Sequence, residues 1–95
     1  MLKTLENLIS TIRQKKTSPD EKSYTSKLLR DKNLSVEKVK EEIAELIEAV
    51  ENNSNTVHEA ADVLYHLLVY LEGNGVRIED IICLLYTSPS PRDRY

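Results

Sequence analysis

The segment from Val57 to Leu71 most constrains what this chain of 95 residues can fold into. Eleven of its fifteen residues are apolar, and a helix of that composition is buried on most of its sides. Three of its polar exceptions, Glu59, Asp62 and His66, recur at helical spacing and therefore lie along one narrow strip. A helix of this kind needs other helices around it, which predicts a helical bundle.

The remainder of the chain continues the helical pattern. Apolar residues at helical spacing predict helices over 2–16, 24–30, 35–51 and 56–72, and a last helix that begins at Arg77. We expect Ser35 to cap the third helix, and Thr56 with Glu59 to form a capping box at the start of the fourth. Strand alternation and a glycine-rich phosphate loop are both missing from the sequence, so the predicted class is all-α.

Composition narrows the possible partners. The net charge of −3 comes without a basic stripe, which argues against a nucleic-acid partner. No apolar run reaches the roughly 18 residues of a membrane span, and the N-terminus has no secretion-signal pattern. We therefore expect a cytoplasmic protein with no membrane partner. A single domain of this size has a thin core, and oligomerisation is a natural way to bury more apolar surface.

The end of the chain has a different character. Residues 83–93 resemble the translation of a transposase adapter used in sequencing libraries. A Ser-Pro-Ser-Pro run at 88–91 cannot continue a helix. We therefore expect a domain over 1–82 and a non-native tail over 83–95, with a genuine disordered tail as the alternative. Cys83 is the only cysteine, so no internal disulfide is possible.

Five carboxylates occur in two short groups, one in each of two predicted helices; they are Glu41, Glu42 and Glu45, then Glu59 and Asp62. Each group forms an acidic patch on one helix face, and antiparallel packing of the helices would bring the patches together. Clustered carboxylates repel one another, and a hard cation such as Mg²⁺ prefers oxygen ligands of this kind. The first group alone is equally consistent with a solvated face. Asp62 favours the metal site, because Asp is a poor residue for a helix interior.

The pattern Glu-Glu-x-x-Glu followed by Glu-x-x-Asp resembles the all-α nucleoside triphosphate pyrophosphohydrolases, often called MazG-like. Two further segments, Ser23-Tyr24-Thr25 and Tyr65-His66-Leu67-Leu68-Val69, are similar to the phosphoribosyl-ATP pyrophosphatase family. The resemblance covers roughly residues 2–82. It implies Mg²⁺-dependent hydrolysis of phosphoribosyl-ATP to phosphoribosyl-AMP and pyrophosphate, the second step of histidine biosynthesis. It also implies an interlaced homodimer.

The resemblance implies roles for individual residues. The metal ligands would be Glu41, Glu42, Glu45, Glu59 and Asp62, with one glutamate of the first group as a possible general base. Candidate substrate contacts are Tyr24, which would stack on or hydrogen-bond to the nucleotide, and the cations Lys27, Arg30 and Lys38, which would meet phosphate oxygens. His66 is expected to support Asp62 from behind rather than to bind the metal.

Two alternatives remain open from the sequence. The first is a housecleaning enzyme of the same superfamily that hydrolyses free nucleoside triphosphates. The second is a non-catalytic helical dimerisation module whose acidic face is merely solvated. In that case Mg²⁺ would not bind, and Glu42→Gln would be harmless or stabilising.

Overall fold

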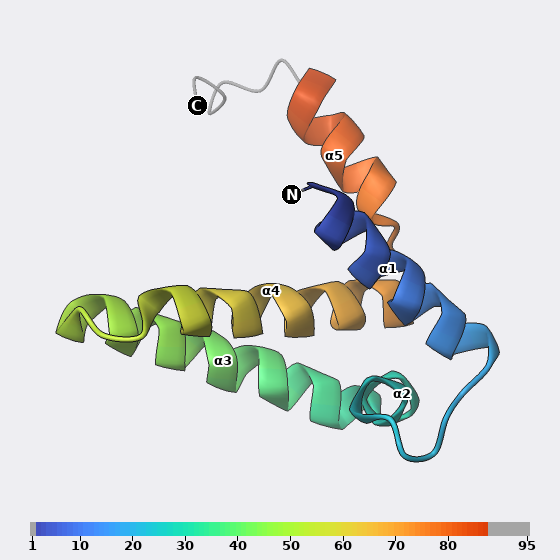
Figure 1. Cartoon of the computed structure of the whole chain (residues 1–95), viewed down its shortest axis with the longest axis horizontal. Coiled ribbons are helices and arrows are strands. Elements are labelled where there is room, and N and C mark those ends of the chain that lie inside the picture. The colour runs from blue at the N-terminus through green and yellow to red at the C-terminus, as the bar shows by residue number, and fades with distance from the viewer. Residues whose placement is uncertain (1, 88–95) are drawn as a thin grey trace.

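The computed structural model describes residues 2–87, and every regular element within them is a helix. The helices are α1 (Leu2–Thr17), α2 (Tyr24–Arg30), α3 (Lys32–Asn52), α4 (Thr56–Gly73) and α5 (Ile78–Thr87). The all-α prediction is confirmed. Figure 1 shows α3 and α4 side by side and antiparallel, joined by a short turn, while α1 crosses the second half of α4.

The start of α3 differs from the sequence prediction. Asp31, rather than Ser35, is the N-cap: its side chain accepts a hydrogen bond from the backbone N–H of Leu34 at 3.0 Å. Asp31 also ends α2, because its backbone N–H donates to the carbonyl of Lys27. One residue thus serves both helices, and α3 begins at Lys32 instead of after the gap that the predicted helices 24–30 and 35–51 leave between them. Ser35 lies inside α3 and is buried.

The predicted capping box at the start of α4 is wrong. The N-cap is Asn55, in the left-handed conformation at φ 54°, and no side chain caps the helix. The hydroxyl of Thr56 instead donates to the carbonyl of Ala49 at 3.4 Å, which ties the start of α4 to the end of α3. The Glu59 carboxylate is therefore not used in capping and remains available on the helix face.

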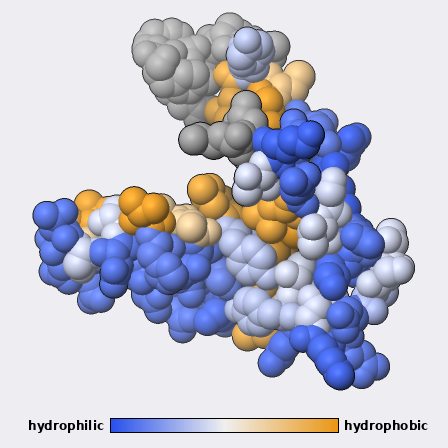
Figure 2. All heavy atoms as spheres, viewed as in Figure 1, coloured by the Kyte–Doolittle hydropathy of each residue, from blue (hydrophilic) through white to orange (hydrophobic). Residues whose placement is uncertain are grey.

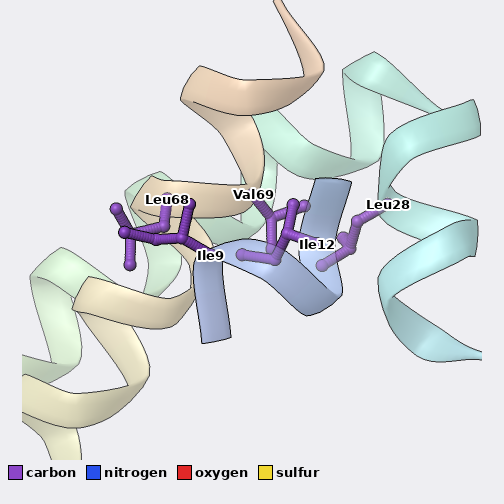
Figure 3. Packing of buried hydrophobic residues seen from close by; sticks show 5 residues of the cluster. All are labelled: Ile9, Ile12, Leu28, Leu68 and Val69. Carbon is purple, nitrogen blue, oxygen red and sulfur yellow. The ribbon is translucent and has the colours of Figure 1, made fainter. Parts of the chain in front are cut away.

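The hydrophobic core lies where α1 and α2 meet the second half of α4. Figure 3 shows its five buried side chains, which are Ile9, Ile12, Leu28, Leu68 and Val69. Burial of each such side chain contributes about 1.5–3 kcal/mol. This core fixes α2 against α4 and so positions Tyr24, the first residue of α2, relative to the α4 strip.

A second apolar surface lies outside this core. Ile43, Ile47 and Val50 on α3 are exposed, as are Val57 and Leu64 on α4. Figure 2 shows hydrophobic side chains gathered along α4 and on α5. None of the helices within residues 2–87 is long and apolar enough to cross a membrane.

The last helix extends further than the sequence predicted. α5 continues through Cys83 to Thr87 and so includes five residues of the segment assigned to the tail. The helix can continue because Cys-Leu-Leu-Tyr-Thr contains no helix-breaking residue. The first proline after the start of α5 is Pro89. Residues 88–95, the remainder of the expected tail, lie outside the described residues.

An ion-pair network joins the first and last helices to the end of α4. Glu72, buried near the end of α4, accepts a hydrogen bond from Arg13 of α1 at 2.8 Å and lies 3.8 Å from the Lys16 ammonium. Arg13 also binds Glu79 of α5 at 2.5 Å. The hydrogen bond from Arg13 lowers the pKa of Glu72 and lowers that of Glu79 to about 2. The ionised side chains of this network therefore hold α1, α4 and α5 together.

Candidate metal centre

The antiparallel packing of α3 and α4 brings all five predicted carboxylates together. They form two overlapping trios, Glu41–Glu42–Glu45 and Glu42–Glu59–Asp62. Within each trio, one oxygen of every carboxylate lies within 4.8 Å of an oxygen of the others. Glu42 belongs to both trios. The cluster thus has one buried residue at its centre and more accessible carboxylates around it.

Glu42 is a buried carboxyl whose charge is only partly compensated by its neighbours. Its residue is only 7% exposed. Burial, and secondarily the neighbouring charges of Glu45 and Asp62, raise the pKa of its carboxyl, while His66 and, less strongly, Lys38 oppose the shift. Within residues 2–87, Oε1 of Glu42 and Oε1 of Glu59 are buried and have no hydrogen-bond partner. A buried carboxylate oxygen without a partner is costly, so the protein alone does not satisfy this cluster.

This donor set fits a hard divalent cation. The trios offer only carboxylate oxygens, two of which are buried and lack partners among the described residues. A cation placed among them would satisfy these oxygens and remove the repulsion between the carboxylates.

Lys38 is the cation nearest to the cluster within the described chain. Its ammonium lies 2.6 Å from Glu41 Oε1 and 3.9 Å from Glu42 Oε2. The hydrogen bond to Glu41 raises the pKa of Lys38, so the side chain stays charged. One positive charge cannot balance five carboxylates, but it places a hydrogen-bond donor at the rim of the site.

Three rings connect α2 to the α4 strip beside the carboxylates. Tyr24 and Tyr65 stack with ring centroids 6.3 Å apart, and His66 contacts both rings edge-on. The Tyr24 hydroxyl lies 3.0 Å from Nε2 of His66, and the Tyr65 hydroxyl lies 2.5 Å from the hydroxyl of Thr25. Burial raises the pKa of Tyr24, which keeps its phenol neutral. Tyr24 is 44% exposed and so presents one side to solvent.

Comparison with known proteins identifies the family of this chain. A family profile described as phosphoribosyl-ATP pyrophosphohydrolase matches residues 5–87. The chain belongs to this family. A protein of Rhodopseudomonas palustris named phosphoribosyl-ATP pyrophosphatase 1 is 41% identical over 81 residues, which cover 82% of this chain and 76% of that protein. A phosphoribosyl-ATP pyrophosphatase of Methanoregula boonei is 41% identical over 86 residues, covering 85% and 83%.

The family also includes longer proteins. A chloroplast histidine biosynthesis bifunctional protein of Arabidopsis thaliana is 42% identical over 89 residues. The match covers 88% of this chain but only 32% of that protein. The sequence prediction of a phosphoribosyl-ATP pyrophosphohydrolase, and hence of a hydrolytic enzyme of histidine biosynthesis, is confirmed at the level of the family.

Not every residue suggested by the family resemblance lies at the carboxylates. Arg30, at the end of α2, lines a cavity of about 230 Å³ with Lys15, Lys16 and Gly73, away from the cluster. Lys27 is exposed, and within residues 2–87 it makes no hydrogen bond or ion pair to the five acids. Of the three predicted cations, the fold brings only Lys38 to the carboxylate cluster.

The two histidines have different relations to Asp62. His66 Nδ1 lies 2.8 Å from the backbone carbonyl of Asp62, and among the described residues it makes no hydrogen bond to the Asp62 carboxylate that it was predicted to support. His58 lies 3.5 Å from the Asp62 carboxylate. The sequence interpretation overlooked this second contact, although the four-residue spacing of His58 and Asp62 on α4 would have indicated it.

Proposed function

We propose that this chain hydrolyses phosphoribosyl-ATP at the α–β phosphoanhydride and releases phosphoribosyl-AMP and pyrophosphate. We propose Mg²⁺ as its cofactor, with Glu41, Glu42, Glu45, Glu59 and Asp62 as ligands. One observation carries the proposal: in a chain of this family, two helices bring five carboxylates together around the buried Glu42, and two of the buried oxygens have no hydrogen-bond partner within residues 2–87. When bound, Mg²⁺ would neutralise charge that develops on the phosphate oxygens.

The chain's own residues divide the remaining work. Lys38 stands beside Glu41 with a charged ammonium that can donate a hydrogen bond to a phosphate oxygen. A carboxylate of the α3 trio would accept the proton of the attacking water as general base. Glu41 and Glu45 are the accessible members of that trio, whereas Glu42 is buried. Tyr24, half exposed at the start of α2, would contact the nucleotide with the accessible part of its side chain.

The exposed apolar surface supports a homodimer as part of the proposal. Ile43, Ile47 and Val50 recur at helical spacing on α3, and Ile47 is 55% exposed. Val57 and Leu64 lie two turns apart on α4, and Val57 is 84% exposed. A second copy would bury these side chains, which a bundle of this size leaves uncovered. An Ile47→Glu variant should then elute as a monomer in size-exclusion chromatography with light scattering, whereas Glu48→Gln, an exposed neighbour, should not change the mass.

We also propose that the catalytic unit is formed by residues 1–82, that 83–95 contributes nothing to the site, and that the enzyme acts in the cytoplasm. The five carboxylates, Lys38 and the Tyr24–His66 pair all precede residue 83. The side chains of Leu84, Leu85 and Tyr86 are exposed. Replacing 83–95 with an unrelated polar helix should therefore leave the metal site unchanged.

The deciding experiment measures pyrophosphate release from phosphoribosyl-ATP, with and without Mg²⁺, beside a panel of ordinary nucleoside triphosphates. Mg²⁺-dependent turnover of phosphoribosyl-ATP is the expected result. Preferential turnover of the free triphosphates would instead assign the chain to the housecleaning relatives. No turnover of any substrate, both by the chain as it stands and after replacement of residues 83–95, would contradict an enzymatic role.

A further inference from the structure

The hydrogen bonds of His66 determine which of its ring nitrogens carries the proton. Nδ1 lies 2.8 Å from the backbone carbonyl oxygen of Asp62. A carbonyl oxygen only accepts, so Nδ1 must carry the hydrogen. In a neutral imidazole the other nitrogen is then an acceptor. Nε2 lies 3.0 Å from the hydroxyl oxygen of Tyr24, and this hydroxyl is therefore the donor.

The surroundings hold this arrangement in place. His66 is 7% exposed, and its ring lies edge-on to Tyr24 and to Tyr65. Tyr65 in turn shares a hydrogen bond with Thr25, the residue after Tyr24. Two hydrogen bonds and two ring contacts thus fix the first turn of α2 on α4. The Tyr24 side chain has little freedom to turn its hydroxyl hydrogen elsewhere.

Because the Tyr24 hydroxyl donates its hydrogen to His66, it can bind only groups that donate a hydrogen bond. Its hydroxyl has one hydrogen, which goes to His66, and its oxygen retains lone pairs that can only accept. Phosphate oxygens at neutral pH are acceptors as well, so Tyr24 has nothing to donate to them. A hydroxyl group of a ribosyl unit, by contrast, is a donor of the required kind.

We propose that His66 is a positioning residue that takes the Tyr24 hydroxyl hydrogen, so that the Tyr24 oxygen accepts a hydrogen bond from a ribosyl hydroxyl of the substrate and does not bind its phosphates. This assignment rests on the proposed function, because it takes the ribosyl-containing substrate from it. It separates recognition in the site into two parts. The carboxylates and Lys38 serve the phosphates, while the Tyr24–His66 pair serves a sugar.

The first test is independent of activity. Long-range ¹H–¹⁵N NMR of the full chain at pH 8 reports which nitrogen of each imidazole is protonated. The chain has only two histidines, and His58, whose side chain is 73% exposed, supplies the reference signals. His66 should carry its proton on Nδ1 and have a bare Nε2. A proton on Nε2 would overturn the proposal whether or not the chain is an enzyme.

The second test uses the two products of the proposed reaction as competitive inhibitors. Tyr24→Phe removes one hydrogen bond and should weaken inhibition by phosphoribosyl-AMP about fivefold to tenfold. In the forward reaction the same substitution should act mainly on KM. Inhibition by pyrophosphate, which has no ribosyl hydroxyl, should not change. Selective loss of pyrophosphate inhibition would instead show that Tyr24 binds phosphate. Tyr70→Phe, the same change at a tyrosine of α4, should leave both inhibition constants unchanged.

Two substitutions of His66 separate positioning from folding. A Gln side chain reaches the depth of Nε2 and can accept from Tyr24, whereas Asn reaches only the depth of Nδ1 and can donate only to the Asp62 carbonyl. His66→Asn should therefore reproduce the KM of Tyr24→Phe, and His66→Gln should recover most of that loss. Equal losses in both variants, with unchanged thermal midpoints, would overturn the role of the Nε2 contact.

Discussion

Glu42→Gln tests the metal centre, because it keeps the shape of the side chain and removes its charge. In the absence of metal, Glu42 is buried among like charges, and one of its oxygens lacks a partner among residues 2–87. A glutamate on a solvated helix face would show little change in stability on neutralisation. Here we expect the metal-free variant to be more stable than the parent chain.

The magnitude follows from the two opposing costs. An unsatisfied buried charged group costs upward of about 1–3 kcal/mol, but the glutamine amide is also buried, so the net gain should lie near the low end, at about 1 kcal/mol. For a domain of this size that corresponds to a rise of about 4–8 °C in Tm. Mg²⁺ at one hundred times its Kd stabilises the parent chain by about 2.7 kcal/mol, which is about 10–20 °C. The variant should lose most of this shift.

The pH dependence provides an internal check. Because the pKa of Glu42 is raised in the folded state, its contribution to stability is fully present below the unfolded value of about 4.3. That contribution is lost as pH rises through the folded value. The stability advantage of Glu42→Gln should therefore grow toward neutral pH and disappear near pH 4.

Differential scanning fluorimetry with and without Mg²⁺, across pH, measures all three effects. Glu48→Gln is the matched control, because Glu48 lies on the same helix, is exposed and belongs to neither trio. The reasoning would be refuted by a Glu42→Gln variant that is destabilised without metal, or by one that keeps the full Mg²⁺ shift. Since a solvated acidic face predicts no Mg²⁺ shift in either protein, the same experiment also tests the non-catalytic alternative.

Further predictions concern the core, the ion-pair network and the metal. Ile12→Ala, at a site with 0% exposure, should cost about 2–5 kcal/mol in urea unfolding; a loss under 1 kcal/mol would mean that the described core is not the stabilising one. Arg13→Ala should cost about 2–3 kcal/mol, because it leaves Glu72 buried with only the distant Lys16. Arg77→Ala, which removes an exposed contact to Glu79, should leave the urea midpoint nearly unchanged. Since the pKa values of Glu72 and Glu79 are lowered, their stabilisation is present above about pH 4.3 and is lost on acidification toward about pH 2. Acid titration by circular dichroism should show that loss in the parent chain and a smaller one in Arg13→Ala. Chelation with EDTA should abolish pyrophosphate release, and Mg²⁺ should restore it; metal-independent turnover would contradict the proposed cofactor.

Local patterns were sufficient to predict most of the architecture. Apolar spacing gave helices over 24–30 and 56–72, and the structure has them at Tyr24–Arg30 and Thr56–Gly73. The helical period also placed each group of carboxylates on one helix face. These features depend on neighbours within one or two turns, which is the range over which sequence patterns act.

Helix ends were less predictable, because several residues compete to satisfy the same backbone groups. Asp31 rather than Ser35 caps α3, since Asp31 already ends α2 at the point where the chain turns. Thr56 matched a capping box, but its hydroxyl bonds to Ala49 across the turn. The choice in each case depends on where the preceding helix lies, and the sequence does not state that position.

The sequence by itself thus determined the class of fold, the family and the five acids that the fold brings together. Only the tertiary structure decided that Glu42 is central and buried, that Lys38 lies at the carboxylates while Arg30 does not, and that Tyr24 meets His66. Tyr24 and His66 are 42 residues apart, and their contact requires α2 to be fixed on α4 by the Ile12 and Leu28 core. Periodicity assigns a residue to one face of its helix. The distance between the faces of two helices is set by the packing of core side chains, which lie on other faces.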